Sequence, residues 1–383
     1  MEQIYLDNAA TTPLSPQVNA AITAAMTLYA NPSSLHGLGL EAEKMVDAAR
    51  ENVARLLGVS PASLIFTSGG TEANNLAIKG FLARSRQRGR LVTSAIEHLS
   101  VLEVFKDLEQ QGWEVLRLPV DAQGKVLLPA LEEALAQPVQ LVSIMAVNNE
   151  TGAVQPLREI VSLIRAMQPQ VCIHVDAVQA LGKIPFHPAE LGVNLASVSA
   201  HKIHGPKGAG ALYADRRDLL LPLLRGGGQE GGLRSGTENV LGIIGFGRAA
   251  LEPAENLDAN LTHVGKLRSQ FLNGLRGLSC KVISPADGAP YILAVSFPGF
   301  RGEVLLQALS SHGVYVSTGA ACSGKKGQLS HVAEAMGLDR ETAGGLLRFS
   351  FSVFNTEAEI DYALHKIRQV LQELAFVQGR RTR

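Results

Sequence analysis

The chain has 383 residues, a formal net charge of zero at pH 7 and an apolar fraction of 46%. This profile indicates a globular α/β protein long enough for two domains, and it excludes disordered and fibrous chains. The balanced charge gives no sign of a surface for nucleic acids or membranes. The longest apolar run, VLGIIGFG, is too short to cross a bilayer.

The three cysteines, Cys172, Cys280 and Cys322, are widely spaced along the chain. An odd number at such spacing predicts neither a disulfide framework nor a metal site. The first residues, MEQIYLDNAATT, do not resemble a signal peptide, because an acid comes second and a short strand follows. We therefore expect a reduced, cytoplasmic protein.

Strand-like and helix-like segments alternate between residues 64 and 213. A helix pattern such as SVLEVFKDLEQQG separates short apolar runs. This alternation predicts a mostly parallel sheet covered by helices on both faces, in which ligands bind beyond the carboxyl ends of the strands. The predicted strands are SLIFTS, RLVTSAI, QLVSIMAV, VCIHVDAV, LASVSA and GALYA.

The pattern changes near residue 250, where LEPAENLDANLTHVGKLRSQFLNGL predicts a long helix. Strands return in PYILAVSF, GVYVST and LLRFSFSVF, and a final helix places an apolar stripe along residues 360–374. We expect a large domain of residues 15–255. A smaller α/β domain would combine residues 1–14 with residues 256–383.

Polar residues follow the first predicted strands of the large domain. Gly70 and Thr71 open a helix after SLIFTS, which suits either an anion cradle or an ordinary helix cap. His98 follows the next strand, although a lone histidine is more often structural. Asn149 follows QLVSIMAV in a segment that also suits a plain polar turn.

The later strand ends carry an acid and an amine. Asp176 closes VCIHVD, with Gln179 one turn later, and Ser199, His201 and Lys202 follow LASVS. A buried carboxylate needs a cation or hydrogen bonds, although Asp176 alone also suits a helix cap. Together the strand ends supply a phosphate cradle, a flat stacking group, an acid for a ring nitrogen and an amine for a Schiff base. This set predicts a site for pyridoxal 5′-phosphate, with Lys202 holding its aldehyde.

With these residues in hand, the chain resembles the cysteine desulfurases of the class-V aminotransferase family, in the branch that supplies sulfur for iron–sulfur clusters. The resemblance covers nearly the whole chain. It rests on the motifs YLDNAATTP, NPSSLHGLG, FTSGGTEANNLAIKG, HVDAVQALGK, SAHKIHGPKG, GGGQEGGLRSGTEN, VSTGAACS and LRFSFSVFNTEAEID. It implies a pyridoxal-phosphate transferase of fold type I, with a mostly parallel seven-stranded sheet in the large domain.

The resemblance also implies roles for the residues at the strand ends. Lys202 would be the Schiff-base lysine. His98 would stack on the cofactor ring and act as a catalytic residue in proton transfer. Asp176 would pair with the ring nitrogen, and Gln179 would contact the ring hydroxyl. The residues implied to hold the phosphate are Gly70, Thr71, Ser199 and His201, with Thr237 reaching the phosphate of the other subunit of a homodimer.

Two further sites are implied for the substrate. Asn149 and Arg348 would bind the carboxylate of L-cysteine; an arginine in the apolar strand LLRFSF needs an anionic partner, and an internal ion pair would serve equally. Cys322 would accept the sulfur as a persulfide and pass it to an acceptor or cluster-scaffold protein. Its Gly-rich setting, with Lys325 and Lys326 nearby, favours an accessible thiolate.

Other functions suit parts of this pattern. A selenocysteine lyase, a cystine C–S lyase or an aminotransferase has the same cofactor, and a lyase that needs no thiol nucleophile would not require Cys322. A thiol-based metal or cluster carrier is disfavoured because the cysteines lack C-x-x-C spacing. A degenerate protein that keeps only the fold is disfavoured by the retained lysine, aspartate, histidine and loop cysteine.

Overall fold

The computed structural model describes residues 3–319 and 329–381, with side chains as far as residue 376. Most of its strands form one sheet of seven in the order β2-β8-β7-β6-β5-β3-β4. These strands are β2 (Leu64–Thr67), β3 (Arg90–Ser94), β4 (Glu114–Leu118), β5 (Val139–Met145), β6 (Cys172–Asp176), β7 (Leu195–Ser199) and β8 (Gly210–Ala214). Only β8 runs antiparallel to its neighbours, so the predicted mostly parallel sheet is confirmed.

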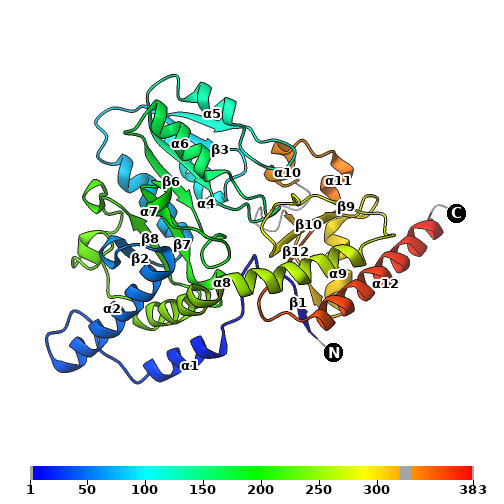
Figure 1. Ribbon diagram of the computed structural model, residues 1–383, viewed down its shortest axis with the longest axis horizontal. Coiled ribbons are helices and arrows are strands. Elements are labelled where there is room, and N and C mark those ends of the chain that lie inside the picture. The colour runs from blue at the N-terminus through cyan, green and yellow to red at the C-terminus, as the bar shows by residue number, and fades with distance from the viewer. Residues whose placement is uncertain (1–2, 320–328, 382–383) are drawn as a thin grey trace.

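Helices cover both faces of this sheet (Figure 1). The α-helices between residues 16 and 191 are α1 (Pro16–Ala25), α2 (Gly37–Leu57), α3 (Gly70–Asn75), α4 (Leu99–Gln110), α5 (Leu128–Ala134), α6 (Leu157–Met167) and α7 (Pro188–Leu191). Alternate side chains of β2 separate the two layers: Leu64 and Phe66 belong to one buried cluster with α2 and α6, whereas Ile65 belongs to another with α3 and α4.

The remaining strands form two small sheets. They are β1 (Ile4–Tyr5), β9 (Lys281–Val282), β10 (Ile292–Ser296), β11 (Val314–Tyr315) and β12 (Leu346–Ser350). In one sheet β10 lies between β12 and β9, and in the other β1 pairs in parallel with β11. Around them lie the helices α9 (Gly302–Ser311), α10 (His331–Ala335), α11 (Arg340–Gly344) and α12 (Glu357–Arg381).

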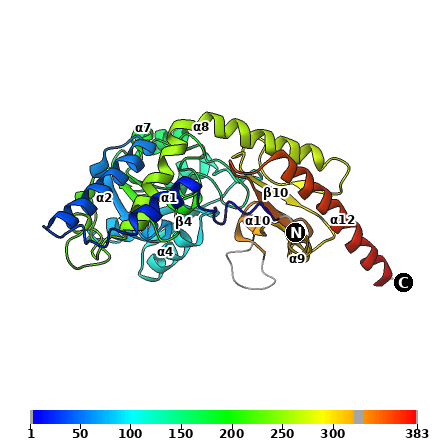
Figure 2. The ribbon, with the colours of Figure 1, turned by 90° about the horizontal axis from the view of Figure 1, so that it is seen from below.

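A long helix, α8 (Val240–Gly274), runs beside both groups of strands (Figure 2). It begins earlier than the sequence predicts, because the apolar run VLGIIGFG forms its first turns. Gly247 lies so close to α2 that an added Cβ would be 2.4 Å from the Cα of Ala49. The helix is interrupted at Asn256, whose φ is −124°, and Pro253 lies just before that point. The expected domain division at residue 255 falls there and stays a prediction.

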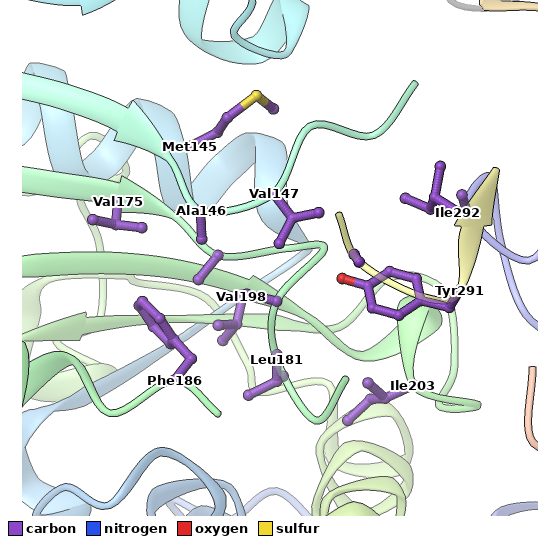
Figure 3. Close-up of a cluster of buried hydrophobic side chains, with 14 of the residues drawn as sticks. Met145, Ala146, Val147, Val175, Leu181, Phe186, Val198, Ile203, Tyr291 and Ile292 are labelled. Carbon is purple, nitrogen blue, oxygen red and sulfur yellow. The ribbon is translucent and has the colours of Figure 1, made fainter. Parts of the chain in front are cut away.

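A continuous buried cluster joins the large sheet to the β10 region. Figure 3 shows, within this one buried cluster, Val147, just after β5, Tyr291, just before β10, and Ile292, the first residue of β10. The Tyr291 hydroxyl donates a hydrogen bond of 2.5 Å to the backbone carbonyl of Gln179. This contact brings the carboxyl ends of the strands against the second group of elements. No helix in the described part of the chain is apolar over a length that would span a bilayer.

Candidate active site

A cavity of about 320 Å³ opens at the carboxyl ends of the parallel strands, where strand–helix folds bind their ligands. Its walls come from the segments that follow β2, β3, β5, β6 and β7, together with Ala9, Ala10 and β12. The residues singled out from the sequence that line this cavity are Gly70, Thr71, His98, Asn149, Asp176, Gln179, His201, Lys202 and Arg348.

Lys202 lies at the end of a short 3-10 turn that directly follows β7. Its Nζ donates hydrogen bonds to the backbone carbonyls of Ala9, at 2.6 Å, and Ala10, at 2.7 Å. Thr12 connects the same N-terminal segment to the turn after β7, because its backbone N–H and its hydroxyl both donate hydrogen bonds of 2.9 Å to the backbone carbonyl of His201. The amine is therefore held at the wall of the cavity, where an aldehyde would meet it.

Asp176 is buried at the end of β6, 5% exposed, and its carboxylate receives neutral donors. Asn74 Nδ2 donates to Oδ2 at 2.8 Å, and the backbone N–H of Val178 donates to Oδ1 at 3.0 Å. No formal cation takes part in these two contacts. A protonated ring nitrogen is the kind of partner that this carboxylate would favour.

His98 caps the N-terminus of α4 and presents one defined tautomer. Its Nδ1 accepts the backbone N–H of Ser100 at 3.1 Å, so the ring proton of neutral His98 lies on Nε2. Burial lowers the pKa of His98, and Lys202 and His331 lower it further, while the Asp176 carboxylate acts in the opposite direction. A neutral, flat imidazole suits stacking on an aromatic ring.

Asn74 links these two groups. Its Nδ2 donates to Asp176 and also, at 2.9 Å, to Ser100 Oγ, which lies 2.8 Å from His98 Nδ1. The Asn74 amide oxygen is buried and has no hydrogen-bond partner within the described structure. The sequence analysis did not select Asn74 or Ser100. Asn74 belongs to the motif GGTEANN, but nothing in that motif indicates contacts with β6 and α4.

The start of α3 and the residues after β7 form a cationic corner. Gly70 packs so tightly that an added Cβ would lie 2.5 Å from Val178 Cγ2. Burial lowers the pKa of His201 to about 4, and the positive charges of Lys202, Lys183 and Lys207 add to that effect. The positive charges of these three lysines, near the N-terminus of α3, suit a phosphate dianion.

Arg348 lies in β12, 4% exposed, and contacts two parts of the chain. Its Nη2 is 2.7 Å from Asp7 Oδ1, and its Nη1 donates to the carbonyl of Asn149 at 2.8 Å. The internal ion pair considered from the sequence is therefore present. Arg348 nevertheless lines the cavity, and its Nε has no hydrogen-bond partner within the described structure.

Two expected site residues lie outside the cavity, and a third lies outside the described residues. Ser199 is buried at the end of β7 but does not line the cavity, and Thr237 is exposed and also outside it. Cys322 falls within residues 320–328 and is outside the described residues. The geometry therefore brings together the residues expected for a cofactor and a carboxylate, and the role of each stays a prediction.

Comparisons with known proteins agree with this geometry. Residues 4–363 match the family described as aminotransferase class-V. A protein named cysteine desulfurase IscS from Dictyoglomus turgidum is 39% identical over 377 residues, which cover 97% of this chain and 95% of that protein. Among solved structures, one titled NifS-like protein has a TM-score of 0.92 at 42% identity, covering 97% of this chain and all of that one. Another, titled SspA in complex with cysteine, has a TM-score of 0.82 at 32% identity, covering 93% and 100%.

The fold and the site thus define a pyridoxal-phosphate-dependent transferase. The chain belongs to the class-V aminotransferase family and, within it, to the cysteine desulfurases. The family, the enzyme class and the cofactor predicted from the sequence are therefore confirmed. The cavity also suits that cofactor: Asp176 accepts hydrogen bonds from two neutral donors, the charges of Lys202, Lys183 and Lys207 lie near the start of α3, and Lys202 lines the same space.

Proposed function

We propose that this enzyme removes sulfur from L-cysteine, releases L-alanine and carries the sulfur as a persulfide on Cys322. The sulfur would pass to an acceptor protein for iron–sulfur cluster or thio-cofactor synthesis. The observation that carries the proposal is that Lys202, Asp176, His98 and Arg348 line one cavity. The structure titled SspA in complex with cysteine supports cysteine as the substrate.

The cofactor residues have separate tasks in this proposal. Lys202 would hold the cofactor aldehyde and, once released, remove the α-proton of the substrate. Asp176 would keep the ring nitrogen protonated, and His98 would stack on the ring. Gln179 would contact the ring hydroxyl, and its Nε2 already donates to the carbonyl of Ala9 at 2.8 Å. When bound, pyridoxal phosphate supplies an electron sink that weakens bonds at the substrate α-carbon.

The phosphate would lie in the cationic corner, held by Gly70, Thr71, Ser199 and His201. Thr237 of a second subunit would complete that site in a homodimer. Its exposed position outside the cavity supports a role toward a partner, because in its own subunit it does not line this site.

Arg348 and Asn149 would hold the substrate carboxylate. Arg348 is anchored by Asp7 through Nη2, so its plane is oriented before the substrate arrives. Asn149 lines the same cavity, and its backbone carbonyl accepts a hydrogen bond from Arg348 Nη1. These contacts would orient the substrate through its carboxylate.

The Cys322 thiolate would then attack the substrate sulfur. An S–S bond forms as the C–S bond breaks, the electron pair of that bond stays with the carbon fragment, and protonation yields alanine. Neither of the other thiols suits this task. Burial raises the pKa of the Cys172 thiol, with Asp215 acting in the same direction, and burial also raises that of Cys280.

The test is one paired experiment on the purified holoenzyme. The visible spectrum is recorded, cysteine is added, and alanine and sulfur are quantified for the wild type, Cys322→Ala and the matched control Cys280→Ala. We expect a yellow protein that yields equal alanine and sulfur, a yellow but inactive Cys322→Ala variant and an active control. Full activity of Cys322→Ala would instead identify a lyase that needs no thiol nucleophile. A protein that cannot be loaded with pyridoxal phosphate would contradict the roles given to Lys202 and Asp176.

A further inference from the structure

Glu150 is a buried carboxyl group next to the active site to which the proposed chemistry assigns no task. It lies in the turn of residues 148–152 that follows β5, and its residue is 5% exposed. The turn is internally fixed, because Asn148 Oδ1 accepts the backbone N–H groups of Glu150, at 3.0 Å, and Thr151, at 2.9 Å. Its neighbour Asn149 lines the cavity and contacts Arg348.

One oxygen of Glu150 contacts Gly319 and Ser330, which lie before and after residues 320–328 in the chain. Ser330 Oγ donates to Glu150 Oε2 at 2.5 Å. On the other side, Gly319 approaches so closely that an added Cβ would lie 2.7 Å from the same Oε2. Cys322 is three residues along the chain from Gly319. Because three residues of chain have a limited reach, the position of Gly319 restricts where the Cys322 thiol can lie.

Further hydrogen bonds hold Ser330 and the segment that precedes Gly319 in place. Ser330 Oγ also accepts the backbone N–H of Val332 at 3.0 Å and so caps α10. The next residue, His331, bonds through Nε2 to the carbonyl of Glu97 at 3.0 Å. On the Gly319 side, Ser317 pairs with Arg348 through backbone hydrogen bonds of 3.1 and 2.7 Å. Glu150 thus connects the substrate-binding turn with elements that also contact Arg348 and the segment before His98.

We propose that Glu150 is a positioning residue for the sulfur-transfer step: it accepts a hydrogen bond from Ser330 and packs against Gly319, beside the Asn149–Arg348 contact, and so holds two described residues that flank the segment containing Cys322. This inference rests on the proposed function of Cys322. Burial raises the pKa of Glu150 to about 7, with Ser330 and Arg348 acting in the opposite direction. Either protonation state keeps a carboxyl oxygen that accepts from Ser330.

The test separates chemistry at the cofactor from chemistry at the thiol. Cysteine is added to the holoenzyme in a stopped-flow instrument, the change in the visible spectrum is followed, and the persulfide on Cys322 is quantified by alkylation and mass spectrometry. For Glu150→Ala we expect a normal spectrum and normal early spectral change, with persulfide formation slowed by about tenfold or more, since a misplacement of about 1 Å can cost that much. Glu150→Gln keeps an acceptor oxygen and should form the persulfide at close to the wild-type rate.

The matched control is Glu334→Ala, which removes an exposed carboxylate from α10. It should behave like the wild type in both readouts. Gly319→Ala provides an independent variant, because its Cβ would displace the Glu150 carboxyl group. It should slow persulfide formation while leaving the early spectral change intact. In the double variant with Gly319→Ala and Glu150→Ala, the increase in the activation free energy of persulfide formation should be smaller than the sum of the increases in the two single variants.

Two outcomes would overturn the proposal. In one, Glu150→Ala and Gly319→Ala form the persulfide as fast as the wild type. In the other, the early spectral change falls in parallel with persulfide formation, which would place the effect at the cofactor instead. A wild-type enzyme that forms no Cys322 persulfide would refute the proposed function itself, and that result is read independently of the Glu150 variants.

Discussion

Arg348 and Asp7, 341 residues apart in the chain, form an ion pair in which Nη2 lies 2.7 Å from Oδ1. The pair joins β12 to the N-terminal segment at the edge of the cavity. It orients the guanidinium plane, and Asn149 accepts from the other terminal nitrogen. The arginine is thus both an internal ion-pair partner and a wall of the active site, two possibilities that the sequence leaves open.

This arrangement predicts the effect of Arg348→Lys on substrate binding. A lysine keeps the charge but loses the planar fork, so it cannot contact Asp7, Asn149 and a carboxylate together. We expect the KM for cysteine to rise by about tenfold or more, with a smaller change in kcat, because a hydrogen bond to a charged group contributes about 1.5–3 kcal/mol. Steady-state kinetics measure both constants. Arg340→Lys, at an exposed position, is the control, and an unchanged KM in Arg348→Lys would contradict the substrate role.

Asp176→Asn tests the role of the buried carboxylate. Asparagine has a similar shape but cannot stabilise a positive charge on the ring nitrogen. We expect the variant to bind pyridoxal phosphate, as its visible spectrum would show, and to lose at least about 100-fold in kcat, the scale of a lost electrostatic contact in an active site. Substituting Asn74 by leucine should have a smaller effect, because Asp176 would keep the Val178 N–H bond. Activity of Asp176→Asn near that of the wild type would show that the carboxylate is not needed.

Glu97 should make stability depend on pH. It is fully buried, and burial raises its pKa to about 8, with the Asp176 charge adding to that effect while hydrogen bonds from Ser94 and Met145 oppose it. An acid whose pKa is higher in the folded than in the unfolded state contributes its full stability below the unfolded pKa of about 4.5, and this contribution is lost as pH rises through 8. The contribution lost between pH 4.5 and pH 8 is on the order of 5 kcal/mol.

The measurement is the urea midpoint of the holoenzyme and of Glu97→Gln across this pH range. Glutamine does not ionise, so the difference between the two proteins isolates Glu97 from other groups such as Glu150. The variant should gain stability relative to the wild type as pH rises from about 5 to about 9. A pH-independent difference would show that the folded-state pKa of Glu97 is not raised.

Cys172→Ala should leave sulfur transfer intact. The thiol lies in β6, 6% exposed, on the face of the sheet that packs against α4. It is a small core group, and its removal should cost about 1 kcal/mol of stability. Persulfide mapping by mass spectrometry should find the modification on Cys322 in both the variant and the wild type. Persulfide on Cys172 in the wild type would contradict this assignment.

The sequence alone determined much of the large sheet and the kinds of residue at its edge. Apolar runs bounded by polar turns identified six of its strands, since buried parallel strands are apolar on both faces. It did not identify β4, whose residues Glu114 and Arg117 are exposed at the sheet edge and lack that signal. A lysine, an aspartate and a glycine-rich helix start directly follow predicted strands, and this position allowed the cofactor site to be predicted from the sequence.

Only the tertiary structure decided which residues make hydrogen bonds and ion pairs with the residues of the site. Asn74 meets Asp176 across 102 residues, Ser330 meets Glu150 across 180, and Asp7 meets Arg348 across 341. Each is an ordinary polar residue in a local turn or helix, and no periodicity marks its partner. A hydrogen bond depends on distances within about 3 Å and on donor direction. Those quantities exist only after strands from distant parts of the chain have packed into one sheet and β12 has closed against it.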